Sequence, residues 1–200
     1  MRLWTNPRVP ELGCAIPRAH GRLLAAAASL GMGLWGWRFE GNFPDRPKMV
    51  VIVAPHTSNW DFLVGLLVKV ALRLKVSFIG KHTLFRWPFG MFLRAIGGIP
   101  VNRAAPLGVV EDALRAFRDQ DRLLLVIAPE GTRRKVEKWK SGFYRIAEAV
   151  GVPIALVAFD YRRQVVRIGP SFEPTGDYER DLPEIQSHFD ASMARRPDRF

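Results

Sequence analysis

A histidine and an aspartate five positions apart, His56 and Asp61, form the pair with the clearest chemical potential. His56 follows the apolar, β-branched run 49–55, which ends in proline and is typical of a strand buried on both faces of a parallel sheet. Asp61 falls in the first turn of an apolar helix predicted over 60–74. The carboxylate could therefore accept the Nδ1 proton and leave Nε2 as a general base. The alternative is a capping aspartate beside a solvated loop histidine.

A second group of polar side chains follows another buried strand. The apolar run 122–129 is followed at once by Glu130, Gly131, Thr132 and Arg133. This turn brings together a carboxylate, a flexible glycine, a hydroxyl and a guanidinium, and a guanidinium is suited to bidentate phosphate recognition. The alternative is a solvated basic loop, the usual outcome for a run of charges.

A third pattern is the segment 97–103, with the sequence GGIPVNR. Its two glycines allow the backbone to turn tightly, and 97–102 is either a short strand or a tight turn. Arg103, at the end of the segment, is a second candidate for binding phosphate. The alternative is a plain turn with an exposed arginine.

These motifs lie in an alternation of predicted strands and helices. Strands are expected at 49–55, 76–80, 97–102, 122–129, 153–159 and 164–169; helices at 60–74, 107–118, 141–150 and 178–195; and an interrupted apolar, aromatic segment at 84–95. The alternation predicts an α/β fold with a mixed, mostly parallel sheet flanked by helices. Ligands in such folds sit beyond the carboxyl ends of the strands, where His56 and Glu130 fall.

The N-terminal part of the chain contains fifteen uncharged, mostly apolar residues, 23–37, flanked by arginines. As a helix this stretch is roughly 22 Å long, shorter than the ~30 Å hydrocarbon core of a bilayer. It is expected to lie in one leaflet, with Trp35 and Trp37 at headgroup depth. The alternative is an ordinary helix buried against the domain. The predicted organisation is a membrane-associating segment at 1–40 and a catalytic domain at 41–200.

The composition limits the classes of partner and of site. Lys and Arg outnumber Asp and Glu by 30 to 19 in 200 residues, a net charge of +11, which favours anionic lipids, phosphorylated substrates or nucleic acid. The aromatic residues of 84–95 cluster with aliphatic ones instead of alternating with basic residues, so no nucleic-acid partner is expected. The single cysteine, Cys14, excludes an intrachain disulfide and a cysteine-based metal cage, and no metal site is expected.

Four blocks stand in a specific order: His-x4-Asp at 56–61, GGIPVNR at 97–103, PEGTR at 129–133 and VPI at 152–154. Together they resemble the glycerolipid acyltransferase family over about residues 45–160. The best-known members acylate 1-acylglycerol-3-phosphate to phosphatidic acid, a step of phospholipid biosynthesis. The resemblance implies a fold like that of the glycerol-phosphate acyltransferases, with an N-terminal helix that docks on the membrane.

The resemblance also implies a role for each matching residue and a set of partners. The roles are base for His56, orienting partner for Asp61, acceptor-phosphate ligand for Arg103, and acceptor-binding turn for Glu130, Gly131, Thr132 and Arg133. No cofactor is expected, since acyl-CoA or acyl carrier protein serves as the donor substrate. The other expected partners are the lipid bilayer and a lysophospholipid acceptor. The expected location is the cytoplasmic face of the membrane, as a peripheral or monotopic protein.

Three residues depart from the family pattern and keep other functions open. Pro55 replaces a common asparagine, Ala128 a common phenylalanine, and Asn102 a common acidic residue. Because they lie where acceptor recognition is expected, a different lyso-lipid or amphipathic acceptor is the first alternative. A hydrolase that uses the same pair and a noncatalytic lipid-binding relative are the others. The sequence has no Gly-x-Ser-x-Gly elbow, which favours direct transfer over a covalent acyl-enzyme.

Overall fold

A single mixed sheet organises the computed structural model, which describes residues 9–19, 21–101 and 106–200. Within these residues the sheet has seven strands in the order β1-β7-β6-β2-β5-β3-β4. Their bounds are Arg38–Glu40 (β1), Lys48–Ala54 (β2), Val76–Lys81 (β3), Gly98–Val101 (β4), Leu123–Ile127 (β5), Ile154–Asp160 (β6) and Val165–Phe172 (β7). Every neighbouring pair is parallel except β6 and β7. The predicted α/β class with a mixed, mostly parallel sheet is confirmed.

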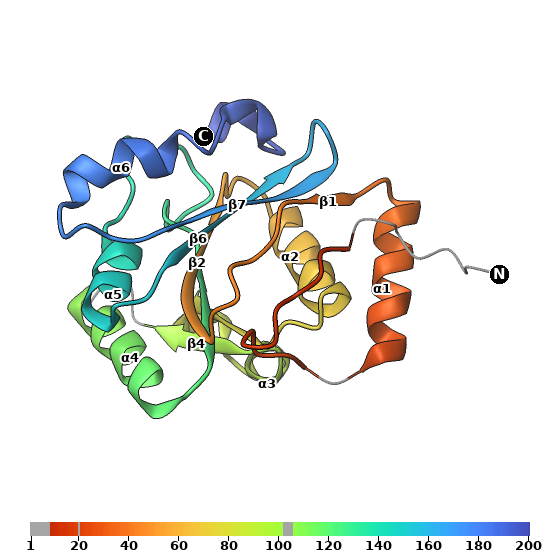
Figure 1. Ribbon diagram of the computed structural model, residues 1–200, viewed down its shortest axis with the longest axis horizontal. Helices are drawn as coiled ribbons and strands as arrows, with labels where there is room; N and C mark the ends of the chain where they lie inside the picture. Colours follow the sequence, from red (N-terminus) through yellow and green to blue (C-terminus); the bar gives the residue numbers. More distant parts are fainter. Residues whose placement is uncertain (1–8, 20, 102–105) are drawn as a thin grey trace.

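Helices cover both faces of this sheet. Their bounds are Arg22–Leu34 (α1), Trp60–Ala71 (α2), Phe89–Ala95 (α3), Pro106–Asp119 (α4), Gly142–Val150 (α5) and Tyr178–Gln186 (α6), with short 3₁₀ turns at His82–Leu84 (η1), Ala191–Met193 (η2) and Pro197–Arg199 (η3). Figure 1 shows α4 and α5 on one side of the central strands and α1 and α2 on the other. The strands β6, β2, β5, β3 and β4 run in the same direction, so their carboxyl ends lie at one common edge of the sheet.

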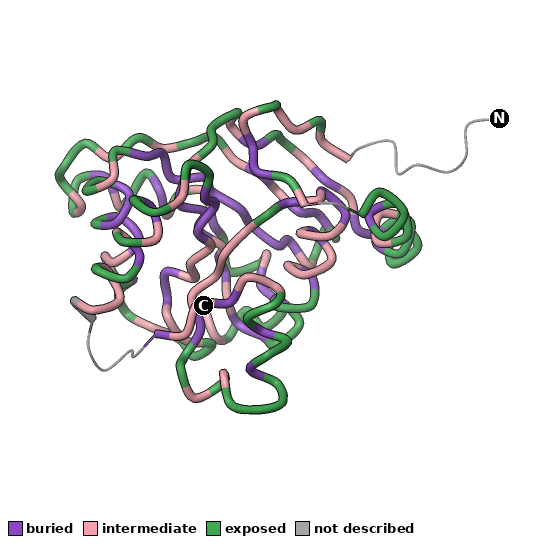
Figure 2. The backbone as a smooth tube through the Cα atoms, turned by 90° about the horizontal axis from the view of Figure 1, so that it is seen from below, coloured by how far each residue is buried: buried purple, intermediate pink, exposed green. Residues whose placement is uncertain are grey.

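The core consists of two apolar layers separated by the sheet. Met49 and Val51 of β2 pack in one layer with Met32 of α1, whereas Val50 and Ile52 pack in the other layer, which also contains α4 and α5. Successive side chains of a strand point to opposite faces, so a strand covered on both faces needs an unbroken apolar run. The burial pattern in Figure 2 follows this arrangement, with the buried residues concentrated along the central strands.

Two strands of the sheet were not assigned from the sequence: β1 was missed, and the segment of β4 was left open between a strand and a turn. β1 was not predicted, because it is three residues long and its partner β7 is distant in the sequence. The segment left open between strand and turn forms β4, which pairs with β3. Gly97 allows this entry: its φ is 98°, and a Cβ there would lie 2.2 Å from the carbonyl oxygen of Val76.

The last helix is shorter than predicted, so the expectation of a helix over 178–195 was wrong at its C-terminal end. α6 ends at Gln186, after which Phe189 is buried with its ring 5.5 Å from the ring of Trp139. Asp190 then takes an extended backbone, and its side chain accepts a hydrogen bond from the N–H of Ser192. Asp190 thereby caps the start of η2. Burial of an aromatic side chain outweighs continuation of a polar helix.

The apolar residues of α1 divide between the interior and the surface. Met32 is fully buried, whereas the side chains of Leu23 and Leu34 are exposed. The same exposed edge of α1 is visible in Figure 2. No helix within the described ranges has both the length and the apolar composition needed to cross a bilayer. Docking of this helix on a membrane and a domain boundary at residue 40 stay predictions.

Candidate active site

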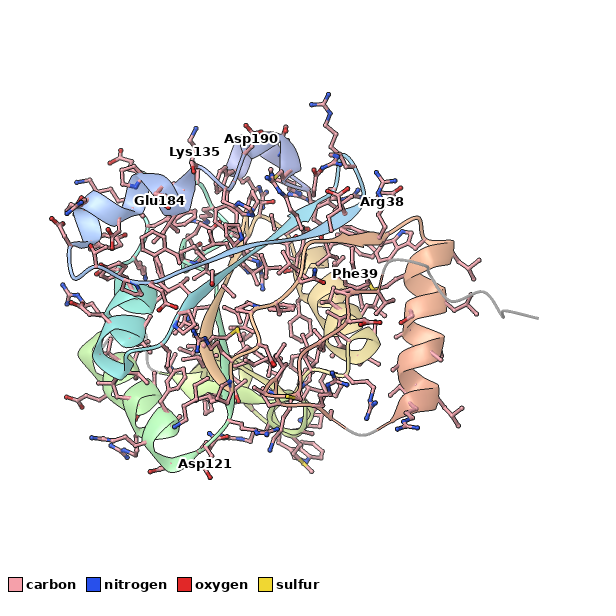
Figure 3. The ribbon with its side chains drawn as sticks, viewed as in Figure 1. Arg38, Phe39, Asp121, Lys135, Glu184 and Asp190 are labelled. Carbon is pink, nitrogen blue, oxygen red and sulfur yellow. The ribbon has the colours of Figure 1, made fainter. Side chains whose placement is uncertain are left out.

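Three neighbouring parallel strands bring polar side chains to one edge of the sheet. β2 lies between β6 and β5. His56 follows β2, Tyr161 follows β6, and Glu130 follows β5. Figure 3 shows Lys135, which follows the turn after β5, at one end of the molecule and Asp121, which precedes β5, at the other. The candidate site therefore lies at the carboxyl edge, where ligands of such folds bind.

The side chains of His56 and Asp61 meet as their spacing predicted. The distance from His56 Nδ1 to Asp61 Oδ2 is 3.1 Å. The same oxygen accepts hydrogen bonds from the N–H groups of Thr57, at 2.9 Å, and Ser58, at 2.8 Å. The loop between β2 and α2 thus folds around the carboxylate, which is almost wholly buried. Such burial is favourable only when donors surround the charge.

A tyrosine that sequence reasoning missed completes the surroundings of Asp61. The hydroxyl of Tyr161 donates to Asp61 Oδ1 at 2.8 Å. Burial, and then the nearby carboxylate, raise the pKa of Tyr161 above its ordinary value, so the hydroxyl keeps its proton and remains a donor. Its ring packs edge-on against Trp37, with 5.1 Å between centroids. The only sequence signal was a polar aromatic residue close after the predicted strand 153–159.

This arrangement is suited to moving one proton. With Nδ1 of His56 held by Asp61, Nε2 is the ring nitrogen left for a substrate, and the side chain of His56 is 22% exposed and lines a cleft. A carboxylate on the far side of the ring fixes the tautomer and stabilises the imidazolium that forms when Nε2 accepts a proton. The geometry supports general-base chemistry at Nε2.

Glu130 is buried and does not line the cleft, although it was predicted to bind the acceptor. Its Oε1 accepts a hydrogen bond from the backbone N–H of His56 at 2.8 Å, which ties the end of β5 to the start of the His56 loop. Its Oε2 is buried with no hydrogen-bond partner among the described residues. Burial raises the pKa of Glu130. In this structure Glu130 is a tether of the His56 backbone, and its role as an acceptor ligand stays a prediction.

The cleft beside His56 has a volume of about 1140 Å³ and contains most of the predicted binding turn. Gly131, Thr132 and Arg133 all line it. Gly131 has a φ of 64°, and a Cβ there would lie 3.1 Å from the side chain of Lys140, so glycine suits the turn. Arg103 lies outside the described residues. The polar side chains of the 129–133 block that line the cleft are thus a hydroxyl and a guanidinium.

The lining of the cleft combines basic and apolar side chains. The basic lining residues are Lys81, Arg133, Arg134, Lys140, Arg145, Arg196 and Arg199, and none of the described lining residues is acidic. Apolar lining residues include Trp60, Leu84, Val110 and Ile146. Such a cleft fits an amphipathic anion. Within the described ranges, no group of His, Cys, Asp and Glu side chains is arranged to hold a metal ion.

Two variants of Glu130 test the tether. Glu130→Gln keeps an oxygen acceptor for the His56 N–H and removes the buried charge, whereas Glu130→Ala leaves that N–H unpaired at a cost of roughly 1–3 kcal/mol. Since the folded-state pKa of Glu130 is raised, the stability that the protonated carboxyl provides is present at low pH and is lost as pH rises through that pKa. The free energy of unfolding, measured by denaturant titration, should favour Gln over Glu increasingly as the pH rises above the ordinary pKa of a glutamate.

The ordering of the three proteins near neutral pH decides the point. The tether predicts that Glu130→Gln is at least as stable as the wild type and that Glu130→Ala is clearly less stable. Equal destabilisation by Gln and Ala would show that the negative charge, and not the hydrogen-bond acceptor, is what the fold requires at this position.

Comparisons with known proteins agree with the observed fold. A family model described as Acyltransferase matches residues 38–160, more than half of the chain. Among solved structures, the crystal structure of the 1-acyl-sn-glycerophosphate (LPA) acyltransferase PlsC from Thermotoga maritima is similar. Its TM-score is 0.61 at 19% sequence identity, covering 82% of this chain and 74% of that chain. The comparison with curated proteins found no match.

The two similarities support different statements. The likeness to PlsC shows that the fold is shared, which confirms the fold predicted from the resemblance. The family model spans both the His56–Asp61 pair and the turn 129–133. Because that model covers more than half of the chain, this protein belongs to the acyltransferase family, as the order of its four motifs predicted.

Proposed function

We propose that this protein transfers a fatty acyl group from acyl-CoA or acyl carrier protein to the hydroxyl of a lysophospholipid. The first candidate acceptor is 1-acylglycerol-3-phosphate, and the product is then phosphatidic acid. The observation that carries the proposal is the His56–Asp61 pair beside a cleft that is partly basic and partly apolar. Membership of the acyltransferase family supports the same reaction class.

In the proposed mechanism, His56 activates the acceptor. Its Nε2 takes the proton of the acceptor hydroxyl while the hydroxyl oxygen attacks the carbonyl carbon of the thioester. The new C–O bond forms, the C–S bond breaks, and the leaving thiolate recovers the proton from the imidazolium. Asp61, held by Tyr161 and two backbone N–H groups, stabilises the imidazolium between these steps. The proposed mechanism uses only the two substrates and requires no cofactor.

The cleft matches the two ends of the proposed acceptor. A phosphate monoester is attracted by Arg133, Arg134 and Lys140, which line the cleft close to one another in the sequence. Acyl chains pack against the apolar part of the lining. Arg103 remains a candidate phosphate ligand on the strength of its motif alone. The departure at Asn102 keeps another lyso-lipid or amphipathic acceptor as the alternative substrate.

Exposed large apolar side chains on three parts of the chain support association with a membrane, and together they are called the exposed apolar surface. They belong to α1, to the start of α2 and to the segment around α3: Leu23, Leu24, Leu30, Leu34, Trp35, Trp60, Phe62, Leu63, Leu84, Trp87, Phe89, Met91 and Phe92. The ring of Trp35 lies 5.9 Å from that of Trp60, which also lines the cleft. We propose peripheral or monotopic attachment through this surface, on the cytoplasmic face, so that a lipid acceptor reaches the cleft from the bilayer.

The reaction is tested by incubating the purified protein with a long-chain acyl-CoA and 1-acylglycerol-3-phosphate, following free thiol and lipid products together. The wild type should form phosphatidic acid, and His56→Ala should lower turnover by roughly two to four orders of magnitude, the usual contribution of a general base. His82→Ala is the matched control, since His82 is exposed and does not line the cleft.

Three other outcomes point elsewhere. Turnover of His56→Ala within about tenfold of the wild type would contradict its role as base. Release of thiol without any lipid product would favour the hydrolase alternative. Binding of lipid without turnover, with carrier-protein donors and phosphate-free acceptors included in the screen, would favour the noncatalytic one.

Membrane attachment is tested with charges placed on α1. Leu23→Glu together with Leu34→Glu changes side chains that are 89% and 76% exposed, so the fold should tolerate both. Flotation with vesicles of phosphatidylcholine and phosphatidylglycerol should fall by about tenfold or more, because charge opposes burial of this surface in lipid. The matched control places glutamates at Ser171 and Ser187, which are exposed elsewhere. Unchanged flotation of the α1 variant would show that the attachment lies elsewhere.

A further inference from the structure

The C-terminal segment, residues 190–200, forms part of the wall of the cleft although no sequence motif includes it. It lies outside the residues matched by the family model. Arg196 and Arg199 line the same cleft as His56. Figure 3 shows Asp190, at the start of the segment, at the same end of the molecule as Lys135, which follows the predicted binding turn. The segment therefore supplies two guanidinium groups to the site.

Three contacts fix this segment against the body of the protein. The N–H of Arg196 donates to Thr57 Oγ1 at 3.2 Å, and Thr57 is fully buried next to His56. The N–H of Tyr161 donates to the carbonyl oxygen of Met193 at 2.9 Å. The ring of Phe200 lies 6.5 Å from that of Trp139, a cleft-lining residue. A backbone held at three points positions its side chains for binding.

The charges of the two arginines are not matched by strong acidic partners. The contact that Arg199 makes with a carboxylate is a 4.0 Å approach to the exposed Asp198, and among the described residues the side chain of Arg196 has no carboxylate within ion-pair distance. The cleft also receives the cations of Arg133, Lys140 and their neighbours. Like charges gathered in one cleft repel each other, and an anion that binds between them relieves the repulsion.

We propose that Arg196 and Arg199 form a phosphate-binding subsite that serves one of the two substrates of the proposed acyl transfer, on which this inference rests. The planar guanidinium binds phosphate through paired hydrogen bonds, which suits the two arginines to this role. The phosphate can come from the donor, where the nucleotide part of CoA carries several, or from the headgroup of the acceptor. The two sources present the same chemistry to the subsite, and binding experiments separate them.

The test uses Arg196→Ala together with Arg199→Ala in the full chain. Both side chains reach the surface and the backbone N–H of Arg196 is retained, so the anchor to Thr57 persists. The matched control is Arg115→Ala with Arg118→Ala, which removes two exposed charges from α4 outside the cleft. Calorimetric titration measures binding of two probes: CoASH, and a short-chain 1-acylglycerol-3-phosphate below its micelle concentration.

Arg196→Ala with Arg199→Ala, the cleft variant, should bind one of the two probes at least about tenfold more weakly than the wild type does. The control should bind both probes like the wild type. Loss of CoASH affinity assigns the subsite to the donor, and loss of lysophospholipid affinity assigns it to the acceptor. Arg196→Lys with Arg199→Lys should recover part of the affinity, because charge is restored without the planar fork. Unchanged affinity for both probes overturns the proposal, as does an equal loss in the control.

Equilibrium binding also separates this inference from the proposed reaction. If the wild type transfers acyl groups and the cleft variant binds both probes normally, the subsite is wrong and the reaction stands. If the wild type transfers no acyl group, but Arg196→Ala with Arg199→Ala binds a probe more weakly than the wild type does, the proposed reaction is wrong and the subsite stands.

Discussion

The site depends on the buried carboxylate of Asp61. A carboxylate removed from water is strongly unfavourable unless hydrogen-bond donors replace the lost hydration. Here Oδ2 accepts from two backbone N–H groups of the β2–α2 loop and faces Nδ1 of His56, while Oδ1 accepts from Tyr161. All four partners must be in place together, so the need to satisfy this one charge fixes the orientation of the His56 ring.

The strand order of the sheet brings these partners together. β2 lies between β6 and β5, so the residue after β6, Tyr161, reaches Asp61 from one side and Glu130, after β5, reaches the backbone of His56 from the other. Segments near the two ends of the chain attach to the same assembly. Trp37 packs on the ring of Tyr161, and the N–H of Arg196 binds the hydroxyl of Thr57. The candidate membrane-docking segment and the C-terminal wall of the cleft thus both contact residues next to the His–Asp pair.

The features that could be predicted from the sequence are local. His56 and Asp61 lie within one strand–helix junction, so their spacing alone indicated that they meet, and unbroken apolar runs indicated the buried strands. Tyr161 could not be predicted to touch Asp61, because the contact joins residues 100 positions apart and depends on the order of strands in the sheet. The burial of Glu130 could not be predicted, because Glu130 belongs to a motif that indicates ligand binding. The position of Arg196 at the cleft could not be predicted, because it depends on the chain leaving α6 after Gln186 and burying Phe189.

The most direct test of the central claim, that Asp61 acts through His56, is a double-mutant cycle with Asp61→Asn and His56→Ala. The measured quantity is kcat/KM for acyl transfer. Groups that act as a unit are non-additive, so Asp61→Asn should lower kcat/KM by roughly two orders of magnitude or more in the wild type and by less than about twofold in the His56→Ala background. Circular dichroism of each variant checks that the fold is retained, because a general loss of folding by Asp61→Asn would lower kcat/KM equally in both backgrounds. Equal losses in the two backgrounds would contradict the account, because Asp61 would then act independently of the His56 imidazole.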